Sequence, residues 1–375
     1  MSFLSNDVLT AIHDRAPHYD ANNAWPKEDF EALKECGYLG AFVPREYGGG
    51  GLNLEEIAAE QTLLAKASPS TALAVNMHQI IVGVARHMVR EGLDQGRKIL
   101  EDAVAGELFA FGISEPGNDL VLFGSITQAT PNAEGYSFTG TKVFTSMAPA
   151  WTRMLTFGRD TDTGKSVFAI ILRETPGIMI KDDWDTIGMR GTQSNTTVLD
   201  NAQSDWILTI TDPGPSTDPV VFGIFANFEV LLAATYMGIG LRAIEVAAEH
   251  VKTRKSVKNQ SVYANDPDIR WRIADAAIRM DGVGPQIREL ARSFDNKDEL
   301  GALWMPRLSA VKNASAEASL HAVDQCIRAC GGSSYYTKNE LSRLYRDVLA
   351  GLFQPSDQES LHGAWAGIVL GPTGD

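Results

Sequence analysis

The sequence has little cysteine, a shortage of basic residues and no export signal. Three cysteines stand among 375 residues, and the closest pair, Cys326 and Cys330, has no third Cys or paired His beside it. This fits neither a disulfide framework nor a zinc site, so we expect reduced thiols, no metal and a cytoplasmic protein. The start of the chain lacks a basic segment followed by an apolar core, and no apolar run approaches the about 20 residues that span a bilayer. We therefore expect neither a signal peptide nor membrane insertion.

Basic residues are outnumbered, with 33 Lys and Arg against 47 Asp and Glu and a formal net charge of −14. A nucleic-acid-binding protein needs a basic face, so we expect no nucleic-acid partner. A ligand that carries phosphate is still compatible with this charge, because helix N-termini and local arginines bind phosphate on acidic proteins as well.

The chain divides into three segments by pattern. Residues 1–110 have helical periodicity, and residues 111–215 have short apolar runs separated by Gly, Asp and Pro, which predict a small antiparallel β-barrel or sandwich. Three prolines between residues 212 and 219 indicate a linker. Residues 216–375 return to helical periodicity, beginning with a long Ala-rich stretch from Phe225 to Arg254. We expect an α+β multidomain protein, with an all-α N-terminal domain, this β middle domain and an all-α C-terminal four-helix bundle.

The individual elements follow from the same patterns. The expected strands contain Ser137–Phe138, Met154–Phe157, Val167–Leu172, Ile178–Ile180 and Thr197–Leu199. Further bundle helices are expected at Ile269–Leu290 and Leu300–Cys330, and Gly331-Gly332 is expected to end the second of them.

Three phrases in the β-segment carry a resemblance to a known family. They are Ser114-Glu-Pro-Gly117, Gly140-Thr-Lys-Val-Phe-Thr-Ser146 and Gly188-Met-Arg-Gly191. In this order they resemble the middle domain of acyl-CoA dehydrogenases, and the resemblance extends over nearly the full chain. It implies bound FAD, an acyl-CoA substrate of fatty acid or lipid catabolism, an electron-transfer flavoprotein as acceptor, and a homo-oligomer, either a tetramer or a dimer. The residues alone indicate hydroxyl and backbone donors at strand ends that face helices, as a planar heteroaromatic cofactor requires.

The resemblance also assigns residues to the flavin ring. Phe144 matches an aromatic residue that stacks on the ring, and Ser146 matches a hydroxyl that bonds near its reactive nitrogen. Ser114 matches a second hydroxyl at the ring edge, and Ile113 and Thr145 stand beside these positions. Without the resemblance, all five would be interpreted as strand residues at turns.

A second group matches the family's cofactor diphosphate site, which a neighbouring subunit provides. Arg254-Lys-Ser256-Val257 matches an Arg-x-x-Phe phrase, with Val257 in place of the Phe that stacks near the adenine. Arg328-Ala-Cys-Gly331-Gly332 matches Gln-x-x-Gly-Gly, and Arg328 would add a cation there. Paired glycines let a backbone approach phosphate closely. Alone, Gly331-Gly332 would be interpreted as a helix stop.

The usual catalytic base is missing. Most members carry a Glu in a Glu-Gly-Thr phrase after an Arg-Asp helix, but here Arg346-Asp347 is followed by a segment with Pro355 at that position. Isovaleryl- and long-chain-type members place the base on the first long helix of the C-terminal domain, and alignment through Gly240-Leu-Arg-Ala243 puts Glu229 there. Its apolar neighbours would raise its pKa, as a base requires. The alternative is a Glu that the helix dipole favours near a helix start.

The expected function is FAD-dependent α,β-dehydrogenation of an acyl-CoA thioester, in which Glu229 takes the α-proton and FAD takes the β-hydride. Two departures weaken the match: Val230 replaces an Arg, and Asp119-Leu-Val121 replaces the Gly-Ser-Asp that seats acyl-CoA. This change and the missing Glu-Gly-Thr favour an alternative, a flavin-dependent monooxygenase of the same fold that uses reduced flavin and O2. A flavin-binding structural partner without turnover is a third possibility.

The segment that replaces Glu-Gly-Thr contains a polar group of its own. Asp357, Glu359 and His362 would either line the mouth of an active site or cap the final helix. The sequence favours the cap, because Asp is a preferred N-cap residue.

Overall fold

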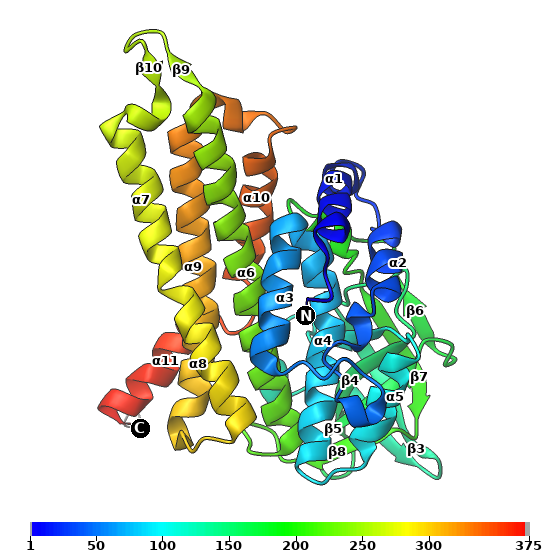
Figure 1. Ribbon diagram of the computed structural model, residues 1–375. Coiled ribbons are helices and arrows are strands. Elements are labelled where there is room, and N and C mark those ends of the chain that lie inside the picture. The colour runs from blue at the N-terminus through cyan, green and yellow to red at the C-terminus, as the bar shows by residue number, and fades with distance from the viewer. Residues whose placement is uncertain (1, 372–375) are drawn as a thin grey trace.

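The structure, a computed structural model, describes residues 2–371 and has three blocks (Figure 1). The helices of the first block are α1 (Asn6–Asn22), α2 (Lys27–Glu35), α3 (Leu54–Ala67), α4 (Pro69–Arg90) and α5 (Gln95–Val104). The strands of the second block are β1 (Phe109–Gly112), β2 (Gln128–Asn132), β3 (Gly135–Lys142), β4 (Arg153–Asp160), β5 (Ser166–Leu172), β6 (Ile178–Ile180), β7 (Thr197–Ser204) and β8 (Ile207–Thr211). The third block contains α6 (Pro219–Thr253), the hairpin β9 (Lys255–Ser256) and β10 (Ser261–Val262), α7 (Pro267–Asp281), α8 (Val283–Asn296), α9 (Trp304–Cys330), α10 (Glu340–Val348) and α11 (Gln358–Leu370).

The strands of the middle block form one sheet in the order β6-β7-β3-β2-β4-β5-β8, with β1 paired to β4. Most pairs are antiparallel, as predicted, but β1 and β2 both run parallel to β4. Over the described residues the sheet stays open, which corrects the barrel form of the prediction. All five predicted strands are present, whereas β1, β2 and β8 were missed. Strand β2 contains Pro131 and mostly polar residues, so it carries no apolar run.

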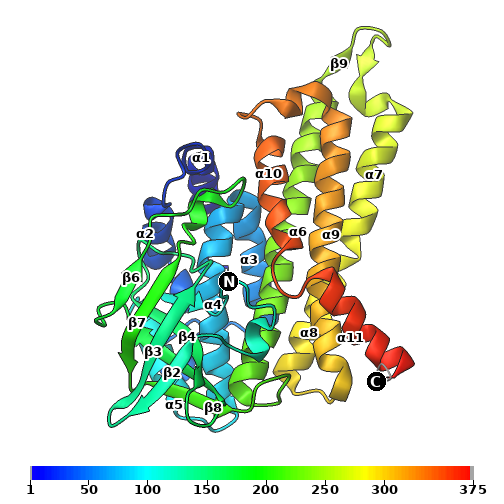
Figure 2. The ribbon, with the colours of Figure 1, turned by 180° about the vertical axis from the view of Figure 1, so that it is seen from behind.

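Helix α6 is the element that joins the other two blocks. Its start is capped by Asp218, whose carboxylate accepts hydrogen bonds from the first turn. In both ribbon views it lies between α3 and α4 on one side and the bundle on the other (Figures 1 and 2). Glycines permit this close packing: a Cβ at Gly238 would lie 2.6 Å from the Cβ of Ala65, and one at Gly240 would lie 2.6 Å from the sulfur of Met280. Packing on both sides fixes the direction in which α6 presents its side chains.

The prediction that no segment is apolar enough to span a membrane was wrong for α6 by length and composition. An 18-residue window of this helix has a mean hydropathy of 1.7, but 83% of the window is buried inside the protein. A helix in the centre of a bundle passes the same test, because it is covered by protein on all sides. The apolar character of α6 is therefore explained by core packing.

The bundle helices differ in detail from the prediction. The expected helix at Ile269–Leu290 is two helices, α7 and α8, separated at Gly282. Helix α9 ends at Cys330, and Gly331 follows with a φ of +72°, so the expected helix stop is confirmed. Asp357 caps α11 by accepting a hydrogen bond from the backbone N–H of Ser360 at 2.9 Å, which confirms the expected cap.

A buried ion pair fixes the loop that follows β1. Lys142 on β3 donates to Glu115 at 2.6 Å, and both side chains are fully buried. Glu115 also accepts hydrogen bonds from the backbone N–H groups of Ile126 and Thr127 and from the hydroxyl of Ser125. Burial raises the pKa of Glu115, but the charge and hydrogen bond of Lys142 outweigh it and lower the pKa to about 2. The loop from Ser114 to Thr127 is thus tied to the sheet at its centre.

Replacing Lys142 by Met should lower the free energy of unfolding by about 3–5 kcal/mol, because Glu115 would be left as an uncompensated buried charge. Urea unfolding followed by tryptophan fluorescence measures the change. Lys165→Met, at a half-exposed lysine immediately before β5, is the control and should change the free energy by less than about 0.5 kcal/mol. Equal stability of Lys142→Met and the control would contradict the role given to the pair.

Candidate functional site

Two neighbouring cavities lie where the sheet meets α6 and the segment after α10. Cavity A measures about 270 Å³ and cavity B about 280 Å³, close to the lower end of the range for small-ligand sites. The residues that line both cavities are Phe111, Ser114, Phe228, Phe353 and Pro355. Because these walls are shared, a molecule in cavity A lies directly beside one in cavity B.

Cavity B combines aromatic walls with a chain of buried hydroxyls. Phe144 keeps 62% of its surface exposed and stands edge-on to Trp184, with ring centroids 6.1 Å apart. The hydroxyl oxygen of Ser194 lies 2.8 Å from that of Ser146 and 2.7 Å from that of Thr192. An open aromatic face beside hydroxyl groups suits a planar ring with polar edges, such as the isoalloxazine of a flavin. The residues present therefore fit a flavin ring.

Two residues that line cavity B, and a third beside two of its lining residues, have a strained backbone. Phe144, Met189 and Gln193 have φ angles of +58°, +52° and +45°, in the left-handed region that side chains other than glycine rarely adopt. The conformation of Met189 is held by its backbone N–H, which donates to the buried Asp347 carboxylate at 2.6 Å. Such conformations cost about 1–3 kcal/mol each and persist where surrounding contacts impose them, which is common at ligand sites.

Glu229 projects from α6 into cavity A and is only 1% exposed. Its Oε1 accepts hydrogen bonds from the backbone N–H of Ser356 at 3.1 Å and from the hydroxyl of Ser356 at 2.7 Å. Its Oε2 is buried and has no hydrogen-bond partner among the described residues. Burial raises the pKa of Glu229 to about 7, against the opposing effects of the Ser356 hydroxyl and the charge of Lys312. This carboxyl group can accept or release a proton near neutral pH.

The segment that carries Ser356 is fixed from α9. The ammonium group of Lys312 donates to the backbone oxygens of Gly351 at 2.8 Å and Ser356 at 3.0 Å, and also to that of Gln354. The side-chain amide of Asn313 donates to the same Ser356 oxygen at 2.8 Å. Burial lowers the pKa of Lys312 to about 8. These bonds hold Ser356 in place, so its two donors stay directed at Glu229.

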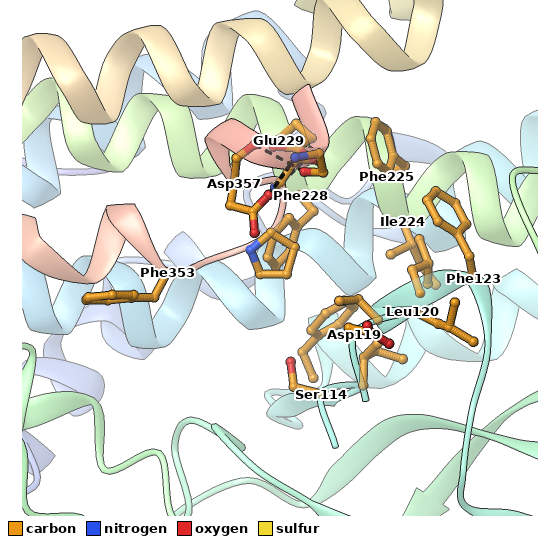
Figure 3. Close-up of a pocket in the computed structure, with 17 residues that line it drawn as sticks. Ser114, Asp119, Leu120, Phe123, Ile224, Phe225, Phe228, Glu229, Phe353 and Asp357 are labelled. Carbon is orange, nitrogen blue, oxygen red and sulfur yellow. Dashed lines mark hydrogen bonds between the residues drawn. The ribbon is translucent and has the colours of Figure 1, made fainter. Parts of the chain in front are cut away.

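The walls of cavity A are aromatic and its charged groups are acidic. Glu229 and Asp357 enter from the helical side, and Asp119 and Leu120 lie on the loop after β1 (Figure 3). The phenyl rings that line it are Phe111, Phe123, Phe225, Phe228 and Phe353. Among the described residues that line cavity A, none is Lys, Arg or His. The cavity therefore suits an apolar ligand that carries no negative charge.

The structure brings the predicted ring-binding residues together around the two cavities, with one exception. Ile113 lines cavity A, Phe144 and Ser146 line cavity B, and Ser114 lines both. Thr145 is buried and lines neither cavity. Within residues 2–371, no three His, Cys, Asp or Glu side chains gather so as to hold a metal ion.

The predicted diphosphate residues lie elsewhere, at the end of the bundle that carries β9 and β10 (Figure 1). Arg254 donates to the backbone oxygen of Cys330 at 2.8 Å, and a Cβ on Gly331 would lie 4.0 Å from its guanidinium. Ser256, Val257, Arg328 and Gly332 lie at the same end of α6 and α9. Arg254 follows Glu229 by 25 residues along α6, about 38 Å at 1.5 Å per residue. One chain therefore does not bring these residues to its own cavities.

Several residues of the site were not found from the sequence. Trp184 and Ser194 line cavity B, and Ser356 and Lys312 position Glu229. Lys312 could have been noticed, because it stands among mostly small and apolar residues of α9 and a buried charge needs a partner. Asp357 both caps α11 and lines cavity A, whereas Glu359 and His362 line neither cavity.

Comparisons with known proteins agree with this geometry. Models of the acyl-CoA dehydrogenase N-terminal and C-terminal domains match residues 7–107 and 230–353. The chain is 29% identical to an L-evernosamine nitrososynthase of a Micromonospora strain, over 97% of this chain and 88% of that protein. It is 26% identical to the putative acyl-CoA dehydrogenase YdbM of Bacillus subtilis, over 93% of this chain and 91% of that protein.

A solved structure extends the likeness to the fold. The structure of a KijD3 in complex with FMN and dTDP-3-amino-2,3,6-trideoxy-4-keto-3-methyl-D-glucose matches with a TM-score of 0.86 and 26% identity, over 98% of this chain and 92% of that one. The cofactor prediction is confirmed, since structural neighbours bind flavin and acyl-CoA dehydrogenases use FAD. With both helical domains matched and the sheet between them, the chain belongs to the acyl-CoA dehydrogenase family of flavoproteins.

Proposed function

We propose that this protein is a flavin-dependent monooxygenase that binds a substrate without a CoA carrier in cavity A, beside the flavin ring in cavity B. The observation that carries the proposal is the chemistry of cavity A, which has a buried carboxylate with one free oxygen and no cation among its lining residues.

The stretches of sequence that form the cavity walls also lack cations, and Lys312, which lies behind the wall, is already bonded to three backbone oxygens. All residues that line cavity A come from stretches of sequence without Lys or Arg, namely residues 99–141, 191–241 and 347–375. CoA carries several phosphate charges, and proteins bind these with Lys, Arg or free helix N-termini. The helix N-terminus at this cavity, that of α11, is already capped by Asp357. A CoA thioester would therefore enter this cavity without a partner for its phosphates.

The relatives support oxygen chemistry. A nitrososynthase, by its name, forms a nitroso group, which requires that oxygen be added to nitrogen, and KijD3 was solved with FMN and an amino sugar. When bound in reduced form, a flavin activates dioxygen and supplies the electrons with which one oxygen atom is transferred and the other leaves as water. This reaction also needs a proton acceptor beside the substrate and a site closed to water.

Glu229 and Ser356 provide the proton acceptor. The free Oε2 of Glu229 can take a proton from a bound substrate, because its pKa is about 7. The hydroxyl and backbone N–H of Ser356 hold the other oxygen, which leaves the direction of the free one unchanged. Phe228 is partly buried and lines both cavities, whereas Phe353, which also lines both, keeps 81% of its surface exposed and does not close them to water.

A second candidate, acyl-CoA dehydrogenation, is favoured by the position of Glu229. A buried carboxyl with a pKa of about 7 beside the flavin cavity is what removal of the α-proton of a thioester requires. In that case an electron-transfer flavoprotein would reoxidise FAD. The two candidates differ in what reduces the flavin, and this can be measured.

The first test supplies the flavin-loaded protein with the two kinds of reductant in turn. We expect no bleaching of the bound oxidised flavin when short-, medium- and long-chain acyl-CoA thioesters are added without oxygen. We expect oxygen consumption when a separate NAD(P)H-flavin reductase provides reduced flavin. Stoichiometric bleaching by any thioester would instead establish the dehydrogenase.

The second test concerns the role of Glu229 as the base. Glu229→Gln should lower kcat by about 10²–10⁴-fold while flavin binding is kept, because the proton acceptor is lost and the shape is preserved. In the wild-type protein, kcat should rise with pH up to about 7 and then level off, since Glu229 must be ionised. Glu359→Gln, an exposed acid of α11 outside both cavities, is the matched control. A wild-type kcat in Glu229→Gln would contradict the assignment of Glu229 as the base.

The third test uses stability in place of activity. Between the ordinary Glu pKa of 4.5 and about 7, folded Glu229 keeps a proton that the unfolded chain has lost. Stability therefore falls as the pH rises through this window and stays lower above it. The advantage of Glu229→Gln over wild type in the free energy of unfolding should be larger at about pH 8 than at about pH 4.5, by up to about 3 kcal/mol. An advantage that does not change with pH in urea unfolding would show that the carboxyl is not buried as described.

A further inference from the structure

One acceptor in cavity A has no donor. The Oε2 atom of Glu229, a residue that lines the cavity, is buried and has no hydrogen-bond partner among the described residues, although Oε1 of the same carboxylate accepts two hydrogen bonds. A buried acceptor without a donor is costly, and a bound ligand can remove this cost by donating. The carboxylate therefore selects a ligand with an N–H or O–H group at its inner end.

The rest of the cavity favours a positive ligand over a neutral one. Asp119 and Asp357 add two carboxylates to its lining, and the three stretches of chain that form it contain no Lys or Arg. Among the described residues, Lys312 of α9 is the one cation whose charge acts on Glu229 and Asp357, so three carboxyl groups stand against one ammonium group. Phe228 and Phe225 present phenyl rings on α6, and aromatic faces attract cations. The charged side chains of the described residues that line the cavity are therefore all acidic, while Lys312, the cation that acts on Glu229 and Asp357, is bonded to backbone oxygens behind the wall. The walls leave room for an apolar body between these groups.

We propose that cavity A binds a small, mainly apolar amine that carries no phosphate, with its nitrogen at Oε2 of Glu229. The inference rests on the proposed monooxygenase function and names its substrate class. The cavity of about 270 Å³ and its five phenyl rings fit an aryl- or alkylamine.

The reaction at this nitrogen balances without further reactants. The ammonium group gives a proton to Glu229, which exposes the lone pair of the neutral amine. An N–O bond then forms and the O–O bond of dioxygen breaks, so that amine, O2 and reduced flavin give a hydroxylamine, water and oxidised flavin. Glu229 afterwards releases its proton to solvent. The amine nitrogen is oxidised, and the reduced flavin provides the second pair of electrons.

The binding test compares matched probes on the flavin-loaded protein at about pH 8. The probes are 2-phenylethylamine, cyclohexylmethylamine and hexylamine, each with the alcohol and the carboxylic acid of the same skeleton, and binding is measured by calorimetry and by the visible spectrum of the flavin. We expect at least one amine to bind about 10-fold or more tightly than its alcohol, and no acid to bind.

A pair of variants tests the place of the nitrogen. Glu229→Gln should weaken binding of that amine by at least about 30-fold and leave binding of its alcohol within about 3-fold, because only the amine loses an ion pair. Glu359→Gln removes the same charge outside the cavity and should change neither. Retained binding of the alcohol shows that Glu229→Gln is folded. If this variant does not fold, the comparison of amine with alcohol in the wild-type protein still tests the proposal.

The outcomes separate this inference from the proposed function. Equal binding of amines and alcohols, tighter binding of an acid, or no binding of any amine would overturn the amine proposal, even if oxygen consumption with a reductase shows a monooxygenase. Amine binding that depends on Glu229, without formation of a hydroxylamine in the presence of reductase and oxygen, would keep the amine site and overturn the monooxygenase. A hydroxylamine formed in proportion to the oxygen consumed supports both.

Discussion

The site depends on a carboxylate that is buried with only one of its oxygens bonded. Among the described residues the second oxygen of Glu229 has no donor, which costs about 1–3 kcal/mol. The protein accepts this cost in the first third of α6, the longest of the described helices. The raised pKa of Glu229 has a related cause, because burial disfavours the charged form of its carboxyl group. A buried carboxylate without a full set of donors is stabilised when a bound ligand donates to it. Such carboxylates are therefore typical of functional sites.

The segment after α10 lines the site, but it provides hydrogen-bond donors instead of the usual catalytic carboxylate. In most acyl-CoA dehydrogenases the base stands in this segment, and here Pro355 occupies that position. The segment instead provides donors, since Ser356 directs its hydroxyl and its backbone N–H at Glu229. Lys312 makes this arrangement rigid by bonding three backbone oxygens of the segment, and its charge also favours the ionised form of Glu229. The buried carboxyl group of this site lies on α6, and the segment holds it through Ser356.

The parts of the protein that could be predicted from the sequence are those with a local pattern. The helices, five strands and the stop at Gly331 follow from periodicity and from residues with special backbone preferences. Glu229 was found through the resemblance, because alignment through Gly240-Leu-Arg-Ala243 places it where some family members carry the base, and its apolar neighbours then supported the role. Lys312 and Ser356 were not found, because their role lies in contacts between segments 44 residues apart, for Lys312 with Ser356, and 127 residues apart, for Ser356 with Glu229. The parallel pairing of β1 and β2 with β4 was missed for the same reason, since no short pattern gives the direction of a partner strand.

The two ends of α6 impose a further constraint on the cofactor. The ring cavity is near Glu229, and Arg254 with Gly331 lies about 38 Å away along the helix. A flavin whose ring occupies cavity B cannot reach those residues in the same chain, so they can act on a cofactor tail only in a second copy. That end of the bundle also exposes Val257, Tyr335 and Trp271, with 86%, 92% and 63% of their surfaces accessible, and apolar groups gathered in this way are typical of interfaces. If the copies associate there, the diphosphate of FAD has its predicted partners. If they do not, cavity B alone holds the ring and the shorter FMN is sufficient. The choice between the two flavins is therefore linked to the association of the chain.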